Sequence, residues 1–217
     1  MEITPSLIRR RNRIAALFPR LVLLWEQIYF ARKVLPRYEK EGFAPPLPAI
    51  LKRAVIRKAA LDNNCKILVE TGTYAGNTPW NLKELFVELH TIEISPILVQ
   101  LAKERFANIP QVHVHEGDSG SVLSQVVPNL TASTLFWLDG HYSGGVTGRT
   151  SVKEYVVFRE LETIFSSCKV PYVILIDDAR CFGTDEDYPS IEALRDFVAR
   201  KNNALKVHVE SDIIYLV

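Results

Sequence analysis

The sequence of 217 residues predicts an α/β fold: a seven-stranded, mostly parallel sheet with helices on both faces. From residue 66 onward, short apolar runs alternate with segments of helical periodicity. The runs are nearly continuous rather than strictly alternating, which is typical of strands covered on both faces in a parallel sheet. Only Ser211 and Asp212 separate the last two runs, so this pair is expected to form an antiparallel C-terminal hairpin.

Each expected element follows from this alternation. Apolar runs of strand length predict strands at residues 66–72 (KILVETG), 88–95 (ELHTIEIS), 112–118 (VHVHEGD), 134–140 (TLFWLDG), 172–178 (YVILIDD), 205–211 (LKVHVES) and 213–217 (IIYLV). Between the runs, helical spacing predicts helices at residues 78–88, 96–108, 119–127, 152–166 and 189–201.

Residues 1–60 differ in charge from the rest of the chain. They hold 13 of the 26 Lys and Arg residues but only 4 of the 25 Asp and Glu residues, a local net charge of +9, whereas residues 61–217 carry −8. Helical spacing broken by prolines predicts that this segment is a basic helical extension preceding an α/β domain. We expect the extension to be a lid over the site or a contact in a homo-oligomer, with peripheral membrane contact as the alternative.

The composition argues against several classes of protein. Cys65, Cys168 and Cys181 show no CxxC or zinc-type spacing, so neither a disulfide framework nor a cysteine metal site is predicted. The apolar stretch at residues 17–30 is interrupted by a proline and two charged side chains and is too short for a membrane span. We therefore expect a cytoplasmic protein, peripheral at a membrane at most. The body is acidic and lacks repeated basic–aromatic interleaving, so nucleic acid is not an expected partner.

The candidate site lies at the carboxyl ends of the predicted strands, where open parallel sheets bind their ligands. Nine of the ten glycines, all except Gly42, follow the runs that end near residues 72, 118, 140 and 178. The first run ends in Glu70-x-Gly72-x-x-x-Gly76 ahead of a helix, a turn that suits close approach of a ligand. It holds only two of the three glycines of the dinucleotide fingerprint, which argues against a nucleotide-dependent oxidoreductase.

Acidic residues end the next two strands. Glu93 ends the second run and is well placed to accept hydrogen bonds from a ribose diol. Asp118 and Ser119 follow the third run, although Asp118 also suits the N-cap of the following helix.

Taken together, these strand ends resemble the S-adenosylmethionine site of class I methyltransferases, over about residues 62–217. The resemblance implies a Rossmann-like fold in which the glycine turn holds the methionine part of the cofactor. It also implies that Glu93 binds the ribose and that the region of Asp118 borders the adenine. The residues predicted to contact the cofactor are Glu70, Gly72, Thr73, Tyr74, Gly76, Asn77, Thr78, Glu93, Ile94, Asp118, Ser119 and Asp139.

Three carboxylates follow the fourth and fifth strands: Asp139, Asp177 and Asp178. They would repel one another unless protonated, separated or bridged by a cation, and hard oxygen ligands suit Mg²⁺, Mn²⁺ or Ca²⁺. The arrangement resembles metal-dependent O-methyltransferases of the catechol and macrocin (macrolide-sugar) types. That resemblance implies a divalent metal, Mg²⁺ above all, held by the three aspartates. It also implies a small-molecule acceptor, a hydroxyl on a sugar or secondary metabolite. The alternative is that Asp177 or Asp178 caps a loop or pairs with Arg180.

Two residues are candidates for the catalytic base. His141 is the first, because an imidazole accepts a proton near neutral pH, and Asp139 is its competitor. The glycine-rich segment at residues 142–150 has the composition of a lid. A non-catalytic, Rossmann-like nucleotide-binding or scaffold protein remains the alternative from another class, although such a protein has no evident need for three clustered carboxylates.

Overall fold

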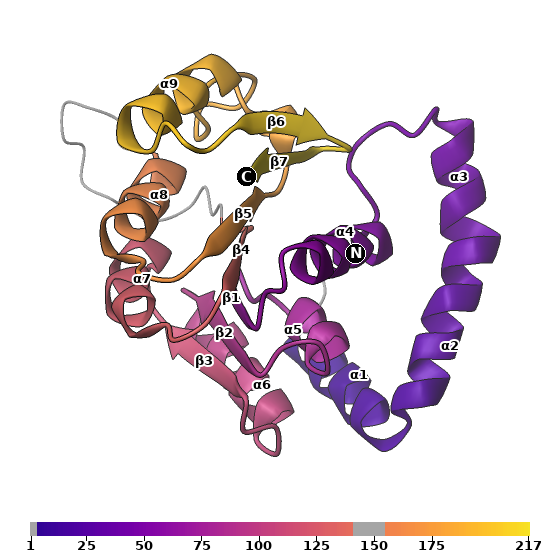
Figure 1. Cartoon of the computed structure of the whole chain (residues 1–217). Helices are drawn as coiled ribbons and strands as arrows, with labels where there is room; N and C mark the ends of the chain where they lie inside the picture. Colours follow the sequence, from indigo (N-terminus) through magenta and orange to yellow (C-terminus); the bar gives the residue numbers. More distant parts are fainter. Residues whose placement is uncertain (1–3, 141–154) are drawn as a thin grey trace.

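The computed structural model describes residues 4–140 and 155–217 and contains one mixed, seven-stranded sheet (Figure 1). The strands are β1 (Ile67–Thr71), β2 (Glu88–Glu93), β3 (Val112–Glu116), β4 (Thr134–Leu138), β5 (Tyr172–Ile176), β6 (Val207–Glu210) and β7 (Ile213–Leu216). Their order in the sheet is β3-β2-β1-β4-β5-β7-β6. Strands β1 to β5 pair in parallel, and β7 pairs antiparallel with both β5 and β6. The predicted fold class is confirmed.

The helices precede, separate and flank the strands. They are α1 (Pro5–Leu17), α2 (Pro19–Tyr29), the π-helix η1 (Phe30–Val34), α3 (Leu35–Lys40), α4 (Ala49–Asp62), α5 (Asn77–Leu82), α6 (Pro96–Phe106), α7 (Ser119–Val126), the 3₁₀ turn η2 (Val127–Asn129), α8 (Val156–Ser167), the 3₁₀ turn η3 (Ala179–Cys181) and α9 (Ile191–Lys201).

Two apolar layers hold the sheet between its helices. On one face, α7, α8 and α9 pack over side chains such as Val69 and Phe136. On the other face, α4, α5 and α6 pack over side chains such as Leu68 and Leu135. Every residue of β1 and β4 is buried, which explains why their apolar residues are consecutive and do not alternate with polar ones.

The C-terminal hairpin has the backbone that its two-residue loop predicts. Ser211 and Asp212 have φ angles of 50° and 66°, so both lie in the left-handed region, as a type I′ turn requires. Such a turn matches the twist of the two strands that it joins. The antiparallel pairing of β6 with β7 is thereby fixed locally.

The N-terminal region divides into two parts that behave differently. Helix α4 belongs to the core, because Ile56 and Ala60 are buried in the same layer as Leu68, so a boundary at residue 60 falls inside this helix. Helix α1 lies against α6, with Ile8 and Ala15 buried. Helices α2 and α3 instead form an arm that stands away from the sheet (Figure 1).

Several large apolar side chains of the arm are exposed, Leu21 and Trp25 among them. Within the described residues, no single helix is long and apolar enough to cross a membrane. In the same part of the chain, one pair bent by 114°, α1 with the helical stretch Pro19–Lys40, could do so by length and composition alone.

Candidate active site

A cavity of about 410 Å³ opens at the carboxyl edge of the sheet, where β1 and β4 end. Its wall contains seven of the residues predicted to contact the cofactor: Glu70, Gly72, Thr73, Tyr74, Asn77, Thr78 and Asp139. The rest of the wall comes from residues 46–48, the start of α4, Ala75 and Trp137. The structure therefore brings the glycine turn and the fourth strand end together around one space.

Glycine is required at the turn because the backbone passes very close to its neighbours. Gly72 has φ +85°, and a Cβ atom there would lie 2.4 Å from the carbonyl oxygen of Asp139. Gly76 has φ +67°, and a Cβ atom there would lie 3.0 Å from the ring of Phe106. Only glycine combines a left-handed backbone with this closeness. The close approach also places the end of β1 directly beside the end of β4.

Glu93 joins the turn after β1 to the end of β2. Its carboxylate is buried and accepts hydrogen bonds from the backbone N–H groups of Tyr74 at 2.8 Å and Ser95 at 2.9 Å. Each carboxylate oxygen keeps a further lone pair that can accept a ligand hydroxyl. Ile94, the next residue along, is exposed.

Glu70 lies beneath the cavity in a buried hydrogen-bonded group. The Thr91 hydroxyl donates to its carboxylate at 2.6 Å, and the hydroxyls of Thr73 and Thr91 lie 2.6 Å apart. Burial raises the pKa of Glu70 to about 8, against the hydrogen bonds from Thr91 and Thr78.

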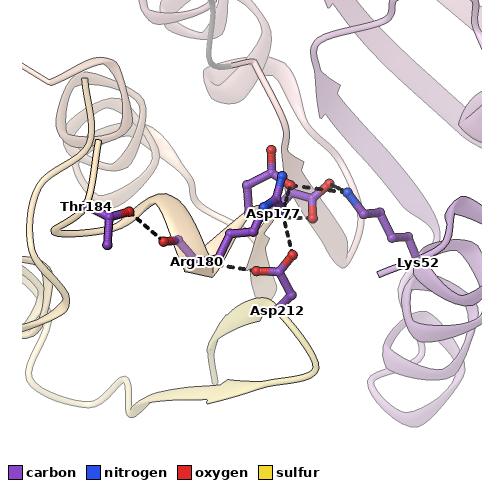
Figure 2. Close-up of polar contacts among 6 residues, drawn as sticks. Lys52, Asp177, Arg180, Thr184 and Asp212 are labelled. Atoms are coloured by element: carbon purple, nitrogen blue, oxygen red, sulfur yellow. Dashed lines mark hydrogen bonds and ion pairs between the residues drawn. The ribbon is translucent and has the colours of Figure 1, made fainter. Parts of the chain in front are cut away.

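Two of the three predicted carboxylates, Asp177 and Asp178, contact a lysine that sequence reasoning missed (Figure 2). The ammonium of Lys52, from α4, contacts Asp177 and lies 3.3 Å from Asp178. Asp178 also pairs with Arg180 at 2.7 Å, which was the predicted alternative role for this residue. Arg180 in turn contacts Asp212 of the hairpin turn.

Electrostatics explain how these charges coexist. Burial raises the pKa of Asp139, and the neighbouring carboxylate of Asp177 raises it further. Burial also raises the pKa of Asp177, against the attraction of Lys52. Burial lowers the pKa of Lys52, but the attraction of Asp177 and Asp178 outweighs it and raises that pKa above its usual value. The ammonium therefore stays charged and stabilises the cluster.

The position of Lys52 determines whether these carboxylates could hold a metal ion. Among residues 4–140 and 155–217, no three His, Cys, Asp or Glu side chains are grouped so that they could hold one. The Lys52 ammonium contacts both Asp177 and Asp178, where an ion bound by them would have to lie. His141 and the predicted lid at residues 142–150 lie outside the described residues.

The third strand end carries a pair of charges next to a buried acid. Asp118 occupies the N-cap position of α7, but its carboxylate accepts two hydrogen bonds from Arg159, both at 3.1 Å, instead of capping the helix. Ser119 begins α7. Glu160, which sequence reasoning missed, is fully buried, and a Cβ atom at Gly140 would lie 3.4 Å from one of its oxygens.

Glu160 is an acid held in an environment that favours its neutral form. Within the described part of the chain, neither of its oxygens completes a hydrogen bond of standard geometry. Burial raises its pKa to about 7, although the nearby hydroxyls of Ser119 and Thr71 favour the ionised form.

We expect the protein to lose stability as the pH rises from 5 to 7. The folded pKa values of Glu70 and Glu160 lie above the value of 4.5 for an unperturbed glutamate, so in this range the folded state holds protons that the unfolded state has lost. Each group then lowers the free energy of unfolding by up to about 1.4 kcal/mol per pH unit. Glu160→Gln should remove the contribution of this residue to the pH dependence, so the free energy of unfolding should fall less steeply with pH. Urea denaturation at several pH values measures this slope. Glu162→Gln, at a half-exposed position on the same helix, should leave the slope unchanged; equal slopes for wild type and Glu160→Gln would contradict the assignment.

The chain was compared with protein families, curated sequences and solved structures, and only the solved structures gave matches. No protein-family model and no curated protein sequence matches the chain. Among solved structures, it is similar to a methyltransferase of Podospora anserina bound to S-adenosylhomocysteine, with a TM-score of 0.54 and 17% identity over 84% of this chain and 86% of the other. An O-methyltransferase of Bacillus cereus in complex with S-adenosylhomocysteine gives a TM-score of 0.54 and 14% identity over 85% and 89%.

A third similar structure also contains the cofactor. The O-methyltransferase TomG of Streptomyces achromogenes, involved in tomaymycin synthesis and in complex with S-adenosylmethionine, gives a TM-score of 0.52 and 17% identity over 83% of this chain and 86% of the other. Together with the strand order and the antiparallel hairpin, these similarities show that the chain has the Rossmann-like α/β fold of class I methyltransferases.

Proposed function

We propose that this protein is an S-adenosylmethionine-dependent methyltransferase that methylates a hydroxyl oxygen. The observation that carries the proposal is the cavity at the carboxyl edge, whose wall contains seven of the residues predicted from sequence to contact the cofactor. A buried carboxylate, Glu93, lies at the next strand end with lone pairs left to accept a ribose diol. The similar structures bound to S-adenosylmethionine or S-adenosylhomocysteine support the same proposal.

The chain's own residues would bind and orient the cofactor. The turn at residues 72–78 would enclose its methionine part, because Gly72 and Gly76 let the backbone approach closely. Glu93 and Ile94 would contact the ribose, and Asp118 and Ser119 would border the adenine. When bound, S-adenosylmethionine supplies a methyl group on a positively charged sulfur.

Asp139 is the described residue best placed to take the acceptor's proton. It lines the cavity, and its raised pKa makes its carboxylate a stronger base than an ordinary aspartate. Asp139 would take the acceptor's hydroxyl proton while the acceptor oxygen takes the methyl group and the electron pair of the methyl–sulfur bond stays on the sulfur, which becomes neutral. The Lys52 ammonium would hold Asp177 and Asp178 in place beside it. His141 remains the other predicted base.

Magnesium assistance is a separate part of the proposal and has its own test. The carboxylates of Asp139, Asp177 and Asp178 are a hard oxygen donor set, but an ion would have to displace the Lys52 ammonium. Methyl transfer measured in EDTA and then with added Mg²⁺ decides between the two cations. Loss of turnover in EDTA supports the metal, whereas full turnover in EDTA removes it and leaves Lys52 as the cation of the cluster.

We further propose that the acceptor is a sugar or small secondary metabolite. This acceptor class follows from the resemblance of the three strand-end aspartates and the glycine turn to the macrocin type of O-methyltransferase.

The cofactor assignment predicts that Glu93→Gln weakens the binding of S-adenosylhomocysteine about tenfold or more. A hydrogen bond to a charged group contributes about 1.5–3 kcal/mol, and the neutral amide loses that strength. Isothermal titration calorimetry measures the effect. Glu116→Gln is the matched control, because Glu116 pairs with Glu93 in the sheet register but is exposed, and it should change the affinity less than about twofold. Absence of binding to the wild-type protein at millimolar ligand would overturn the proposed function.

A further inference from the structure

A second and larger cavity, of about 980 Å³, separates the arm from the body of the protein. Its wall is mainly apolar and comes from α1, α2 and the start of α4, with Ile14, Leu21, Trp25 and Tyr29 among the lining side chains. Within the described part of the chain, α2 buries none of its residues, and Leu21 and Trp25 are 62% and 63% exposed. These apolar side chains therefore face a space large enough for a drug-sized molecule.

The two cavities adjoin each other. Pro48, Ala49, Arg53 and Asn77 line both of them, so the first turn of α4 and the start of α5 form a shared wall. A molecule in the larger cavity can therefore reach the space beside Asp139 and the glycine turn. The larger cavity is a continuation of the proposed methyl-transfer site, not a separate surface feature.

The charged side chains of the larger cavity are mostly cationic. Three arginines and one glutamate line it, a net charge of +2. Glu26 pairs with Arg11 at 3.1 Å and with Arg53 at 3.2 Å, so it is shared between two cations. Among the described residues, Arg10 has no ion-pair partner. An apolar space with an excess of positive charge is complementary to a molecule that is apolar and anionic.

We propose that this cavity binds the apolar part of the methyl acceptor and that the acceptor is an anionic amphiphile. The proposal rests on the proposed function and narrows its acceptor class, because a small sugar alone would leave the apolar wall in contact with water. The acceptor's apolar group would lie along α2, its anionic group near Arg10, and its hydroxyl toward Asp139. Burial of exposed apolar area on both partners would drive binding.

Straight-chain fatty acids test this chemistry without knowledge of the natural acceptor. Octanoate, decanoate and dodecanoate, each below its micelle concentration, are titrated into the full chain by calorimetry. The expected affinity rises about tenfold for each two methylene groups added, as apolar burial predicts. Decyl glucoside, which is neutral, should bind at the same site more weakly than decanoate. The Arg10→Gln variant should lower the affinity for decanoate about threefold and leave the affinity for decyl glucoside unchanged. Affinity that does not change with chain length overturns the proposal.

Two leucines on α2 provide matched variants. Leu21 lines the cavity, whereas Leu24, 52% exposed, is not among the lining residues. Leu21→Gln should lower the affinity for decanoate about tenfold, and Leu24→Gln should lower it less than twofold. Equal effects of the two variants would assign binding to the outer face of the arm, as a membrane surface would require, and would overturn the cavity site. A wild-type dimer that Leu21→Gln converts to a monomer, without decanoate binding in either, would assign the cavity to a second copy of the chain.

Failure of the proposed function is measured separately in the same samples. Binding of S-adenosylhomocysteine depends on Glu93 and the glycine turn, which lie outside the arm. If the fatty acids bind with an affinity that rises with chain length but S-adenosylhomocysteine does not bind, the amphiphile site is supported and the proposed methyltransferase function is overturned. If S-adenosylhomocysteine binds but decanoate does not, the proposed function is supported and the amphiphile site is overturned.

Discussion

Lys52→Met is expected to lower the free energy of unfolding by about 3 kcal/mol at pH 8, because it removes one partner of a buried ion pair. The Asp177 side chain is fully buried and the Lys52 side chain is 19% exposed, so water cannot replace the lost ammonium. Among the described residues, Arg180 would then be the cation left in contact with Asp178, and Asp177 would lose its ion-pair partner. Urea denaturation measures the loss, and at lower pH the loss should be smaller, because burial raises the pKa of Asp177 and its protonated form no longer needs a cation.

Lys58→Met is the matched control for this prediction. Lys58 lies on the same helix and pairs with Asp62, but both side chains are mostly exposed, at 77% and 56%. Exposed pairs of this kind contribute little to stability, because water and salt screen them. Adding Asp177→Asn to Lys52→Met should recover at least half of the lost stability, because it removes the uncompensated charge. A loss no greater than that of the control would show that Lys52 does not stabilise the cluster.

The fold was predictable because its signals are local. Continuous apolar runs identify β1 and β4, and a two-residue loop leaves no room for a crossover between β6 and β7. The least accurate helix was α5, which ends at Leu82 instead of residue 88. There the chain must turn so that Val87 donates a hydrogen bond to the carbonyl of Lys66 and β2 can align with β1. That requirement is set by the sheet and not by the helix's own sequence.

The charged partners of the site were less predictable, because they come from distant parts of the chain. Lys52 is 125 positions from Asp177, and its helix carries other cations that also suit a solvated face. A local signal was nonetheless present: Lys52, Ile56 and Ala60 share one helical stripe, and the last two are buried. A lysine at the end of a buried stripe must reach either water or an acid. The pairing of Arg159 with Asp118 has no comparable signal.

Gly72→Ala is expected to destabilise the protein by roughly 3 kcal/mol and to reduce methyl transfer on the order of a hundredfold. Two costs combine in this variant. A non-glycine residue at φ +85° is strained, and its Cβ atom would lie 2.4 Å from a backbone oxygen of Asp139. Backbone cannot rotate away as a flexible side chain can, so the ends of β1 and β4 must separate. Because both strand ends line the same cavity, the displacement would move Asp139 relative to the glycine turn.

Gly42→Ala separates these two costs. Gly42 has φ +69°, so alanine there meets the same kind of strain, but among the described residues nothing lies within 4 Å of the added Cβ atom. We expect a loss of about 1 kcal/mol and unchanged binding of S-adenosylhomocysteine. The difference between the stability losses of the two variants then measures the effect of the close approach of β1 to β4 alone. If both variants lost the same stability, the conformation of Gly72 would be the whole of its role, and the strand ends would tolerate a side chain between them. If Gly72→Ala lost activity but little stability, the turn would serve the cofactor more than the fold.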